Sequence, residues 1–403
     1  MFAILLLNFT NKTLTVSYQS ENITASPRAP WRNIMVLFGL VLLGLSVGNV
    51  VSLIVVYVVS SFNSTISIDQ IGNLLQNPTQ VPHAWWYIMS MQFVAHIFTF
   101  LIPSLVYWRW IEKRSLVHFI KKPIPSFLLF LITFTLVIVF MPFDSFVIEL
   151  NKKMSLPPNL KAIENWMSNQ EVLLERMSLF LTDFTSWTKL FVAFFVIAVT
   201  AAVGEECLFR GLIQRKIFDK IQNMHVAIWI AAALFSAIHL QFYGFLPRML
   251  LGALFGYLYW WSANLWVPIV AHLVNNGFTI VLIFFNNKKI IEFDISQSEN
   301  SVSVLLGVIS LLLTGVLLYY FKKNTGNLAL GTNTESENWS KVFESPHQHQ
   351  AQIIHDYLIE KNIVSVILNK KDSNYHWGRY ELFVNPADDE IVRNIIANDI
   401  SFK

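Results

Sequence analysis

Long hydrophobic runs recur along this chain of 403 residues, separated by polar stretches. A helix needs about 20 mostly apolar residues to cross a bilayer. Eight runs are candidates for membrane-spanning helices: Ile34–Ser60, Trp85–Trp108, Phe127–Ile148, Trp187–Gln214, Val226–Tyr243, Leu246–Trp261, Trp266–Phe285 and Val302–Phe321. The sixth is the weakest candidate, because it is short and follows the fifth closely. The pattern predicts an all-α polytopic membrane protein with about eight transmembrane helices.

The pattern changes after Lys323, where a polar stretch rich in Gly, Asn, Thr and Ser indicates a linker. The segments beyond it alternate between strand and helix character: Lys341–Glu344, Ser345–Lys361, Ile363–Leu368, Arg379–Val384 and Pro386–Ala397. This β-α-β-β-α order predicts a small ferredoxin-like α+β sheet. The segment resembles a small bacterial α+β domain of unknown function. We therefore expect an N-terminal segment (1–33), a transmembrane domain (34–323), a linker (324–340) and a soluble domain (341–403).

Basic residues in the predicted loops indicate an orientation, because Lys and Arg in short loops mark the cytosolic side. They follow the second, fourth and eighth runs: Arg109, Lys113, Arg114, Lys121, Lys122; Arg215, Lys216, Lys220; Lys322 and Lys323. Residues 61–84, after the first run, contain no Lys or Arg. These charges predict a multi-pass protein of the cell membrane with both termini in the cytosol.

Two further segments are apolar without being candidates for a span. In residues 149–186, Leu160, Ile163 and Trp166 recur at helical spacing, which predicts an interfacial or packed amphipathic helix on the outer side. The run Phe2–Leu7 is too short to span and lacks a preceding basic segment, so it does not predict a signal peptide.

Composition agrees with a membrane protein and excludes some functions. The chain is 54% hydrophobic and 14% charged, whereas soluble domains carry about 25% charged residues. The net charge of +3 is too small to indicate nucleic-acid binding. The single cysteine, Cys207, excludes an intrachain disulfide and a site built from several cysteines.

Polar side chains interrupt three of the runs at positions that should lie within the bilayer. They are Glu205, Glu206 and Arg210 in the fourth run, His239 in the fifth, and His272 and Asn276 in the seventh. A charged side chain at the bilayer centre costs about 2.5–3.5 kcal/mol even on a lenient scale, and such residues by default mark a functional site. We therefore expect the function at this polar centre.

The fourth and fifth runs predict a helical hairpin that turns near Gln222. Glu205 and His239 each lie 17 residues from that turn, so regular helices would hold them at the same depth. His272 and Asn276 are four residues apart and share one helix face. We expect one pocket, open to the cytosol, to contain these four side chains.

Spacing also assigns partners within the centre. Glu206 and Arg210 lie at i and i+4 and can form an ion pair, which leaves Glu205 without an intrahelical cation. A buried carboxylate without its own cation is suited to act as a general base. His239 can share the proton, and His272 and Asn276 can donate to a developing oxyanion. This set predicts water-activated amide hydrolysis without a covalent nucleophile.

Several other residues are interpreted as structural. Phe235 is expected to pack beneath His239, and Cys207 to lie on another face of its helix. His96, His118 and His225 have no partners at useful spacing and are expected to be incidental. The tail histidines His347, His349 and His355 are expected to lie at a solvated helix start rather than to bind a metal.

A metal-dependent alternative stays open. Glu205, His239 and His272 are residue types that zinc accepts, with water as a fourth ligand. The chain has no HExxH pair of the kind that marks a helical zinc site. We therefore expect no cofactor, although ligands on three separate helices can still bind zinc.

Three motifs carry a family resemblance. EExxxR at Glu205–Arg210, FxxxH at Phe235–His239 and HxxxN at His272–Asn276 occur in this order on predicted transmembrane segments. Together they resemble the CPBP family of intramembrane glutamic proteases, which includes the type II CAAX prenyl endopeptidases and abortive-infection-like relatives. The resemblance implies a membrane-embedded CAAX-type endopeptidase of eight helices. It also implies that Glu205 and His239 activate water, that His272 and Asn276 stabilise the oxyanion, and that Glu206 and Arg210 support them.

The sequence thus predicts an intramembrane endopeptidase that cuts a membrane-bound or lipidated protein. One alternative is a non-catalytic immunity or scaffold protein whose polar centre only joins helices. Another is a transporter with a proton relay, which is disfavoured because the polar residues fall in one half of the chain. The soluble domain is expected to bind a protein or small-molecule regulator. The natural substrate does not follow from the sequence.

Overall fold

The computed structural model describes residues 30–63, 72–113, 125–291, 304–331, 339–361, 363–369 and 379–399. The predictions for Phe2–Leu7, His118, Arg114, Lys121 and Lys122 lie outside these residues. The chain divides into two compact units. One comprises Met1–Trp260 and Asn264–Leu312, and the other comprises Trp261–Ala263 and Leu313–Lys403.

The described residues include six helices that are long and apolar enough to cross a membrane. They are Arg32–Ser61, Ala84–Ile111, Phe127–Lys152, Trp187–Ile221, Trp266–Asn287 and Val304–Thr325. Each overlaps one of the eight predicted spans, so the prediction of an all-α multi-pass membrane protein is confirmed.

The two remaining predicted spans are helices as well, but shorter ones. The fifth forms α11 (Met224–Ala237, 14 residues) and the sixth forms α12 (Phe245–Ser262, 18 residues). The chain leaves helical geometry between them, where Leu240 has a φ of 54°. A φ in this region places a non-glycine residue in the left-handed conformation, which stops a helix. His239 therefore lies in the connection after α11 and not inside a span.

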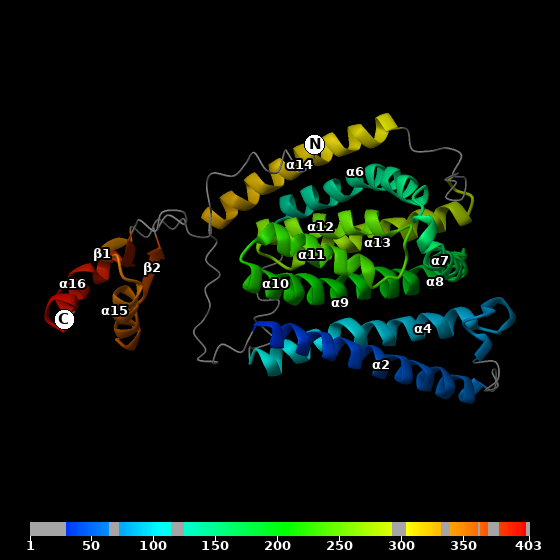
Figure 1. Ribbon diagram of the computed structural model, residues 1–403, viewed down its shortest axis with the longest axis horizontal. Helices are drawn as coiled ribbons and strands as arrows, with labels where there is room; N and C mark the ends of the chain where they lie inside the picture. The colour runs from blue at the N-terminus through cyan, green and yellow to red at the C-terminus, as the bar shows by residue number, and fades with distance from the viewer. Residues whose placement is uncertain are drawn as a thin grey trace. The chain divides into compact units, whose positions relative to one another are not determined.

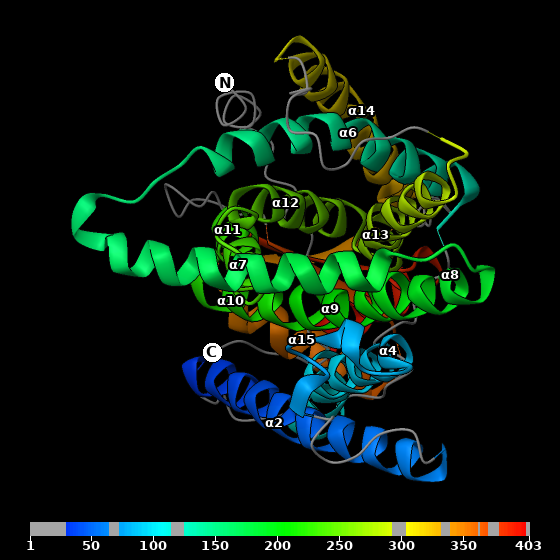
Figure 2. The same cartoon turned by 90° about the vertical axis from the view of Figure 1, so that its right-hand side faces the viewer.

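The first unit stacks its helices around the fourth span (Figures 1 and 2). The helices α2 (Pro30–Asn63) and α4 (Ala84–His96) pack together on one side of α9 (Ala201–Leu208). On the other side, α9 packs against α13 (Trp266–Asn287), which in turn contacts α6 (Phe127–Lys152). The fourth span consequently lies inside the bundle, and 61% of its most apolar window is buried.

Several of these helices contain π-helical turns. In the second span, η2 (Ile97–Leu101), α5 (Ile102–Val106) and η3 (Tyr107–Ile111) follow α4. The fourth span runs through α8 (Trp187–Ala193), η6 (Phe194–Thr200), α9, η7 (Phe209–Ile213) and α10 (Gln214–Ile221). Such turns are rare and occur frequently at functional sites, because they shift the side chains and carbonyls that follow them.

The hairpin turn and the amphipathic helix occur where the sequence predicts them. Gln222 ends α10 with a φ of 58°, and Asn223 caps α11 by accepting a hydrogen bond from Val226 N at 3.1 Å. The helix α7 (Lys161–Thr182) occupies most of residues 149–186, after the short turn η5 (Pro158–Leu160). Another short 3-10 turn, η1 (Pro78–Gln80), precedes α4.

The last part of the chain forms the predicted α+β fold. Its elements are β1 (Ser340–Ser345), α15 (Gln348–Glu360), β2 (Ser365–Asn369), β3 (Tyr380–Val384), η8 (Pro386–Asp388) and α16 (Asp389–Asn398). The three strands pair antiparallel in the order β1-β3-β2, and the helices cover a core that includes Ile354, Leu358 and Leu382. The preceding helix α14 (Val304–Gly331) continues into the predicted linker, of which 332–338 lie outside the described residues.

Candidate active site

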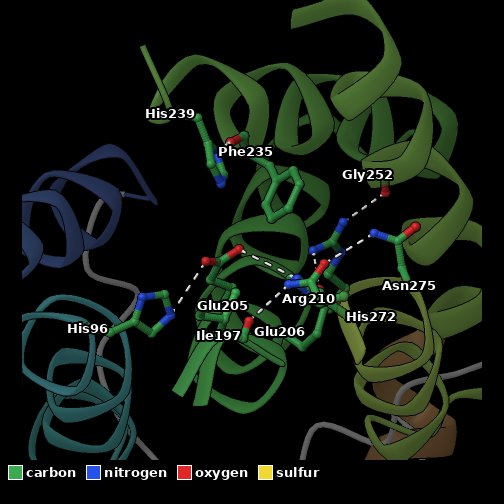
Figure 3. A network of polar contacts seen from close by, with 11 residues as sticks. His96, Ile197, Glu205, Glu206, Arg210, Phe235, His239, Gly252, His272 and Asn275 are labelled. Atoms are coloured by element: carbon green, nitrogen blue, oxygen red, sulfur yellow. Dashed lines mark hydrogen bonds and ion pairs between the residues drawn. The ribbon is translucent and has the colours of Figure 1, made fainter. Parts of the chain in front are cut away.

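The polar centre is built on the buried fourth span. Glu205 and Glu206 lie on α9 and Arg210 lies one turn later in η7 (Figure 3). Their exposed fractions are 5%, 0% and 1%. Three ionisable side chains are therefore held inside the protein, away from lipid and from bulk water.

Glu206 and Arg210 form the predicted ion pair. Arg210 Nη1 lies 2.7 Å from Glu206 Oε1, and Arg210 Nη2 donates to the carbonyl oxygen of Gly252 at 2.8 Å. The guanidinium also lies over the rings of Phe235 and Phe255, with Cζ 4.9 Å and 5.6 Å from the ring centroids. These contacts tie α9 and η7 to both helices of the α11–α12 pair.

His272 joins α13 to the same carboxylate. Its Nδ1 lies 2.8 Å from Glu206 Oε1, and its ring stacks on Phe255 at a centroid distance of 5.4 Å. A carboxylate accepts hydrogen bonds, so Nδ1 carries the proton of this contact. In the neutral ring Nε2 then has a free lone pair, and it lies 4.0 Å from Glu205 Oε2. Glu206 thus orients His272 with a basic nitrogen toward Glu205.

Glu205 has a partner that the sequence interpretation missed. His96, at the end of α4, brings its Nε2 to 3.4 Å from Glu205 Oε1. Figure 3 shows the imidazole ring approaching the carboxylate from the side opposite Arg210. The expectation that His96 is incidental is wrong. A lone histidine in an apolar run has no local signal, because its partner is more than one hundred residues away in the sequence.

His239 is held by the helix that precedes it. Its Nδ1 lies 2.8 Å from the carbonyl oxygen of Phe235, four residues earlier. Because a carbonyl only accepts, this contact leaves Nε2 as the free nitrogen of the neutral ring. In Figure 3 the ring points toward the side of the site where the Glu205 carboxylate lies. The described residues show no hydrogen bond or ion pair between His239 and Glu205.

Phe235 packs at the centre of these groups, as predicted. Its ring centroid lies 5.3 Å from that of His239 and 6.0 Å from that of His272, both edge-on. The side chain is 2% exposed. Phe235 therefore separates the two histidines and closes one wall of the site with apolar surface.

Asn276 is held by the π-helical segment η6. Its Nδ2 donates to the carbonyl oxygen of Ile197 at 3.1 Å, and its Oδ1 accepts from Asn275 Nδ2 at 3.1 Å. A π-helical turn widens the backbone ladder and makes its carbonyls accessible to side chains. An amide nitrogen carries two protons, so Asn276 keeps one donor beyond this contact.

The other residues considered in the sequence have structural partners. Cys207 is fully buried and packs in an apolar cluster with Tyr107 and Trp108. His225 Nδ1 lies 2.8 Å from Tyr257 Oη, and His355 Nδ1 lies 2.8 Å from Ser365 Oγ. In the parts of the chain that the structure describes, no three His, Cys, Asp or Glu side chains are grouped so that they could hold a metal ion.

The arrangement combines a buried carboxylate with two imidazole nitrogen atoms close to it. Glu205 Oε2 is buried and has no hydrogen-bond partner among the described residues. His272 Nε2 lies near Oε2, and His96 Nε2 lies near Oε1. A site of this kind can accept a proton at Glu205 and donate or return protons through imidazole rings.

Fold and site together define a polytopic membrane protein with a buried centre of ionisable side chains inside its helical bundle. Residues 187–278 match the sequence model of the type II CAAX prenyl endopeptidase Rce1-like family. This segment contains the EExxxR, FxxxH and HxxxN motifs, so the resemblance to CAAX-type membrane proteases is confirmed there.

The chain is also similar to individual proteins over short segments. The chain is similar to the uncharacterized protein YpbD of Bacillus subtilis (strain 168), with 32% identity over 77 residues, 18% of this chain and 36% of YpbD. It is also similar to the membrane-embedded CAAX protease MroQ of Staphylococcus aureus (strain USA300), with 28% identity over 104 residues, 24% of this chain and 42% of MroQ. The chain thus spans less than half of the length of these relatives. No solved structure gives a significant match.

Proposed function

We propose that this protein is an intramembrane endopeptidase that hydrolyses a peptide bond of a membrane-associated or lipidated protein. The carrying observation is the buried Glu205 carboxylate, whose Oε2 has no hydrogen-bond partner in the described chain and lies 4.0 Å from His272 Nε2. The similarity to a membrane-embedded CAAX protease supports the same reaction class.

In the proposed reaction Glu205 removes a proton from water, and the water attacks the peptide carbonyl carbon. The proton passes to the leaving amine directly or through His239, whose Nε2 is the nitrogen left free by the contact with Phe235. No covalent intermediate with the protein forms. Cys207 has no part in the reaction, because it lies in an apolar cluster.

His272 and Asn276 stabilise the oxyanion that develops on the carbonyl oxygen. Asn276 donates the amide proton that Ile197 does not use. His272 donates its Nδ1 proton to a hydrogen bond with Glu206, so it can donate from Nε2 only after that nitrogen has accepted a proton, and the Glu206 carboxylate then stabilises the cation. This is the role that an orienting carboxylate has beside a catalytic histidine in other hydrolases.

The test is cleavage of a library of transmembrane and lipidated peptides by the purified protein in detergent or liposomes. Glu205→Gln keeps the shape of the side chain and removes the base, so we expect normal folding and a loss of activity of about 100-fold or more. Cys207→Ser is the matched control on the same helix and should retain activity. Equal activity of Glu205→Gln and the parent protein would refute the proposal. Absence of cleavage in every arm would favour a scaffold or immunity role.

Metal dependence is tested in the same assay. We expect activity to survive treatment with a chelator, because water activation is assigned to the Glu205 carboxylate. Stoichiometric zinc in the purified protein, together with reversible loss of cleavage on its removal, would make Glu205, His239 and His272 metal ligands instead. Orientation is also a proposal: the site faces the cytosol and both termini lie there, as the basic loops indicate.

A further inference from the structure

We infer that His96 is a positioning residue for Glu205, and that the second span thereby completes the catalytic centre. His96 holds Oε1 of the carboxylate and leaves Oε2 for the attacking water. This inference rests on the proposed hydrolase function, but it assigns a role outside the three motifs that carry the family resemblance.

His96 and His272 approach different oxygens of the Glu205 carboxylate, and His96 lies closer. His96 Nε2 lies 3.4 Å from Glu205 Oε1, whereas His272 Nε2 lies 4.0 Å from the other oxygen, Oε2. His96 Nε2 is buried and has no hydrogen-bond partner among the described residues, and Glu205 is the side chain with which it forms an ion-pair contact. The backbone of Ala201, one turn before Glu205, also lies within reach of the ring. Catalytic hydrogen bonds are often long without substrate and tighten in the complex, so a 3.4 Å separation suits a contact of this kind.

Two residues lie against the imidazole ring of His96. The ring of Phe100 lies 4.4 Å from it, centroid to centroid, one turn along the second span. Gly204, the residue before Glu205, also lies close to the ring. A Cβ atom at Gly204 would lie 3.2 Å from Phe100 Cβ and 3.4 Å from His96 Cδ2. The absence of a side chain at position 204 therefore lets the second span approach α9 closely.

The backbone changes from α-helical to π-helical geometry directly after His96. His96 is the last residue of α4, and the π-helical segment η2 begins at the next residue. A π-helical turn inside a helix costs stability relative to a regular turn and is frequent at functional sites. Here it coincides with the residue that faces Glu205.

A carboxylate needs such an anchor for a physical reason. The terminal torsion of a glutamate side chain has a broad, roughly two-fold energy profile, so its two oxygens exchange places easily. Among the described residues, no hydrogen bond joins Glu205 to another side chain. A donor on Oε1 fixes the plane of the carboxylate and directs the lone pairs of Oε2 toward one site. Removing the donor should lower the rate of the chemical step and leave substrate binding nearly unchanged.

The experiment compares His96→Leu with His96→Gln in purified protein, using kcat and KM for one cleaved peptide and the thermal unfolding midpoint. Leucine has a similar volume and no donor. We expect its kcat to fall about 10- to 100-fold, the range found when a side chain that orients a metal ligand is lost, with KM within about 3-fold. Glutamine places an amide N–H near the position of Nε2, so we expect it to recover kcat to within about 5-fold of the parent.

His225 provides a matched control, because it is a partly buried histidine of α11 with a hydrogen bond to Tyr257 and no place in the proposed reaction. His225→Leu should change kcat less than about 2-fold. The inference is overturned if His96→Leu keeps the parent kcat. It is also overturned if His96→Leu and His96→Gln lose kcat equally, in step with their unfolding midpoints, since that indicates packing alone.

Failure of this inference is distinct from failure of the proposed function. If Glu205→Gln is inactive while His96→Leu is fully active, Glu205 remains the base and only the role of His96 is wrong. If Glu205→Gln is as active as the parent protein, the proposed function fails first, and the role of His96 fails with it.

Discussion

Glu206 is the residue on which the polar centre depends for its structure. It is 0% exposed, and its Oε1 lies within 2.8 Å of both Arg210 Nη1 and His272 Nδ1. One buried oxygen atom therefore joins the fourth span to α13. A buried carboxylate is stable only when such partners compensate for its lost hydration.

Removing one member of the Glu206–Arg210 pair should destabilise the protein. We expect Glu206→Ala and Arg210→Ala each to cost about 3–5 kcal/mol, because each strands a buried charge. Thermal unfolding in detergent measures this loss. Arg379→Ala removes a cation whose side chain is 60% exposed from a pair with Glu344, whose side chain is 37% exposed, and should leave the midpoint nearly unchanged. If Glu206→Ala and Arg210→Ala both unfold at the wild-type midpoint, the buried ion pair does not stabilise the protein and the prediction is wrong.

Sequence spacing predicted this centre in part. The Glu206–Arg210 pair follows from i,i+4 geometry, which acts within one helix and needs no tertiary information. The prediction that Glu205 and His239 lie at equal depth assumed regular helices. The structure instead places a π-helical segment after Glu205 and ends α11 before His239. His96 was missed because its contact with Glu205 depends on how α4 packs against α9.

At the scale of elements, two backbone carbonyls of α12 accept hydrogen bonds from side chains of the fourth span. The Gly252 carbonyl accepts from Arg210, and the Gly256 carbonyl accepts from Gln214 Nε2 at 3.3 Å. The two donors and the two acceptors are each four residues apart, so one face of the fourth span aligns with one face of α12. Small residues at this spacing allow helix backbones to approach closely in membranes.

A methyl group on this face should separate the helices. A Cβ atom at Gly256 would lie 2.8 Å from Ile228 Cγ2 and 2.9 Å from Gln214 Oε1. We expect Gly256→Ala to destabilise the protein by about 1–3 kcal/mol through overpacking. The control is Gly39→Ala on α2, where nothing lies within 4 Å of the new atom and alanine favours the helix by up to about 1 kcal/mol. Opposite shifts of the two unfolding midpoints are expected, and equal shifts would contradict the close packing.

Element types were easier to predict from the sequence than element lengths. Hydrophobic runs identified every transmembrane helix that the structure describes, because burial in lipid needs an apolar surface around the whole helix. The same signal cannot tell a full span from a shorter helix enclosed by protein. Residues 226–243 and 246–261 are apolar since they pack in the bundle, and the structure forms α11 and α12 there.

At the scale of the whole molecule, the tail has a core of its own. We expect a fragment of residues 338–403 to fold without the membrane domain, because Ile354, Leu358, Leu382, Val384 and Val392 are completely buried there. A dispersed NMR spectrum of the soluble fragment is the measurement. A soluble fragment with a collapsed, undispersed spectrum would contradict independent folding.

The stability of this fragment should also fall in acid. The hydrogen bond from Lys341 and a second one from Arg379 hold the pKa of Glu344 below its usual range, and Arg393 does the same for Asp389. A carboxyl whose pKa is lower in the folded state stabilises the fold above its unfolded pKa. That contribution is lost as the pH falls through the folded pKa. We therefore expect the unfolding midpoint of the fragment to decrease below about pH 4, near the usual range of carboxyl groups.

The burial of the fourth span has a consequence for biogenesis. In its most apolar window 61% of residues are enclosed by protein, against 17% for Arg32–Ser61. A segment leaving the ribosome has no bundle around it, so Glu205, Glu206 and Arg210 then face the translocon and lipid at about 2.5–3.5 kcal/mol each. We expect the isolated fourth span to insert less efficiently than the isolated first span in a glycosylation reporter assay. Adding the neighbouring helices should restore insertion, because the fourth span then enters the membrane together with the partners that neutralise its charges.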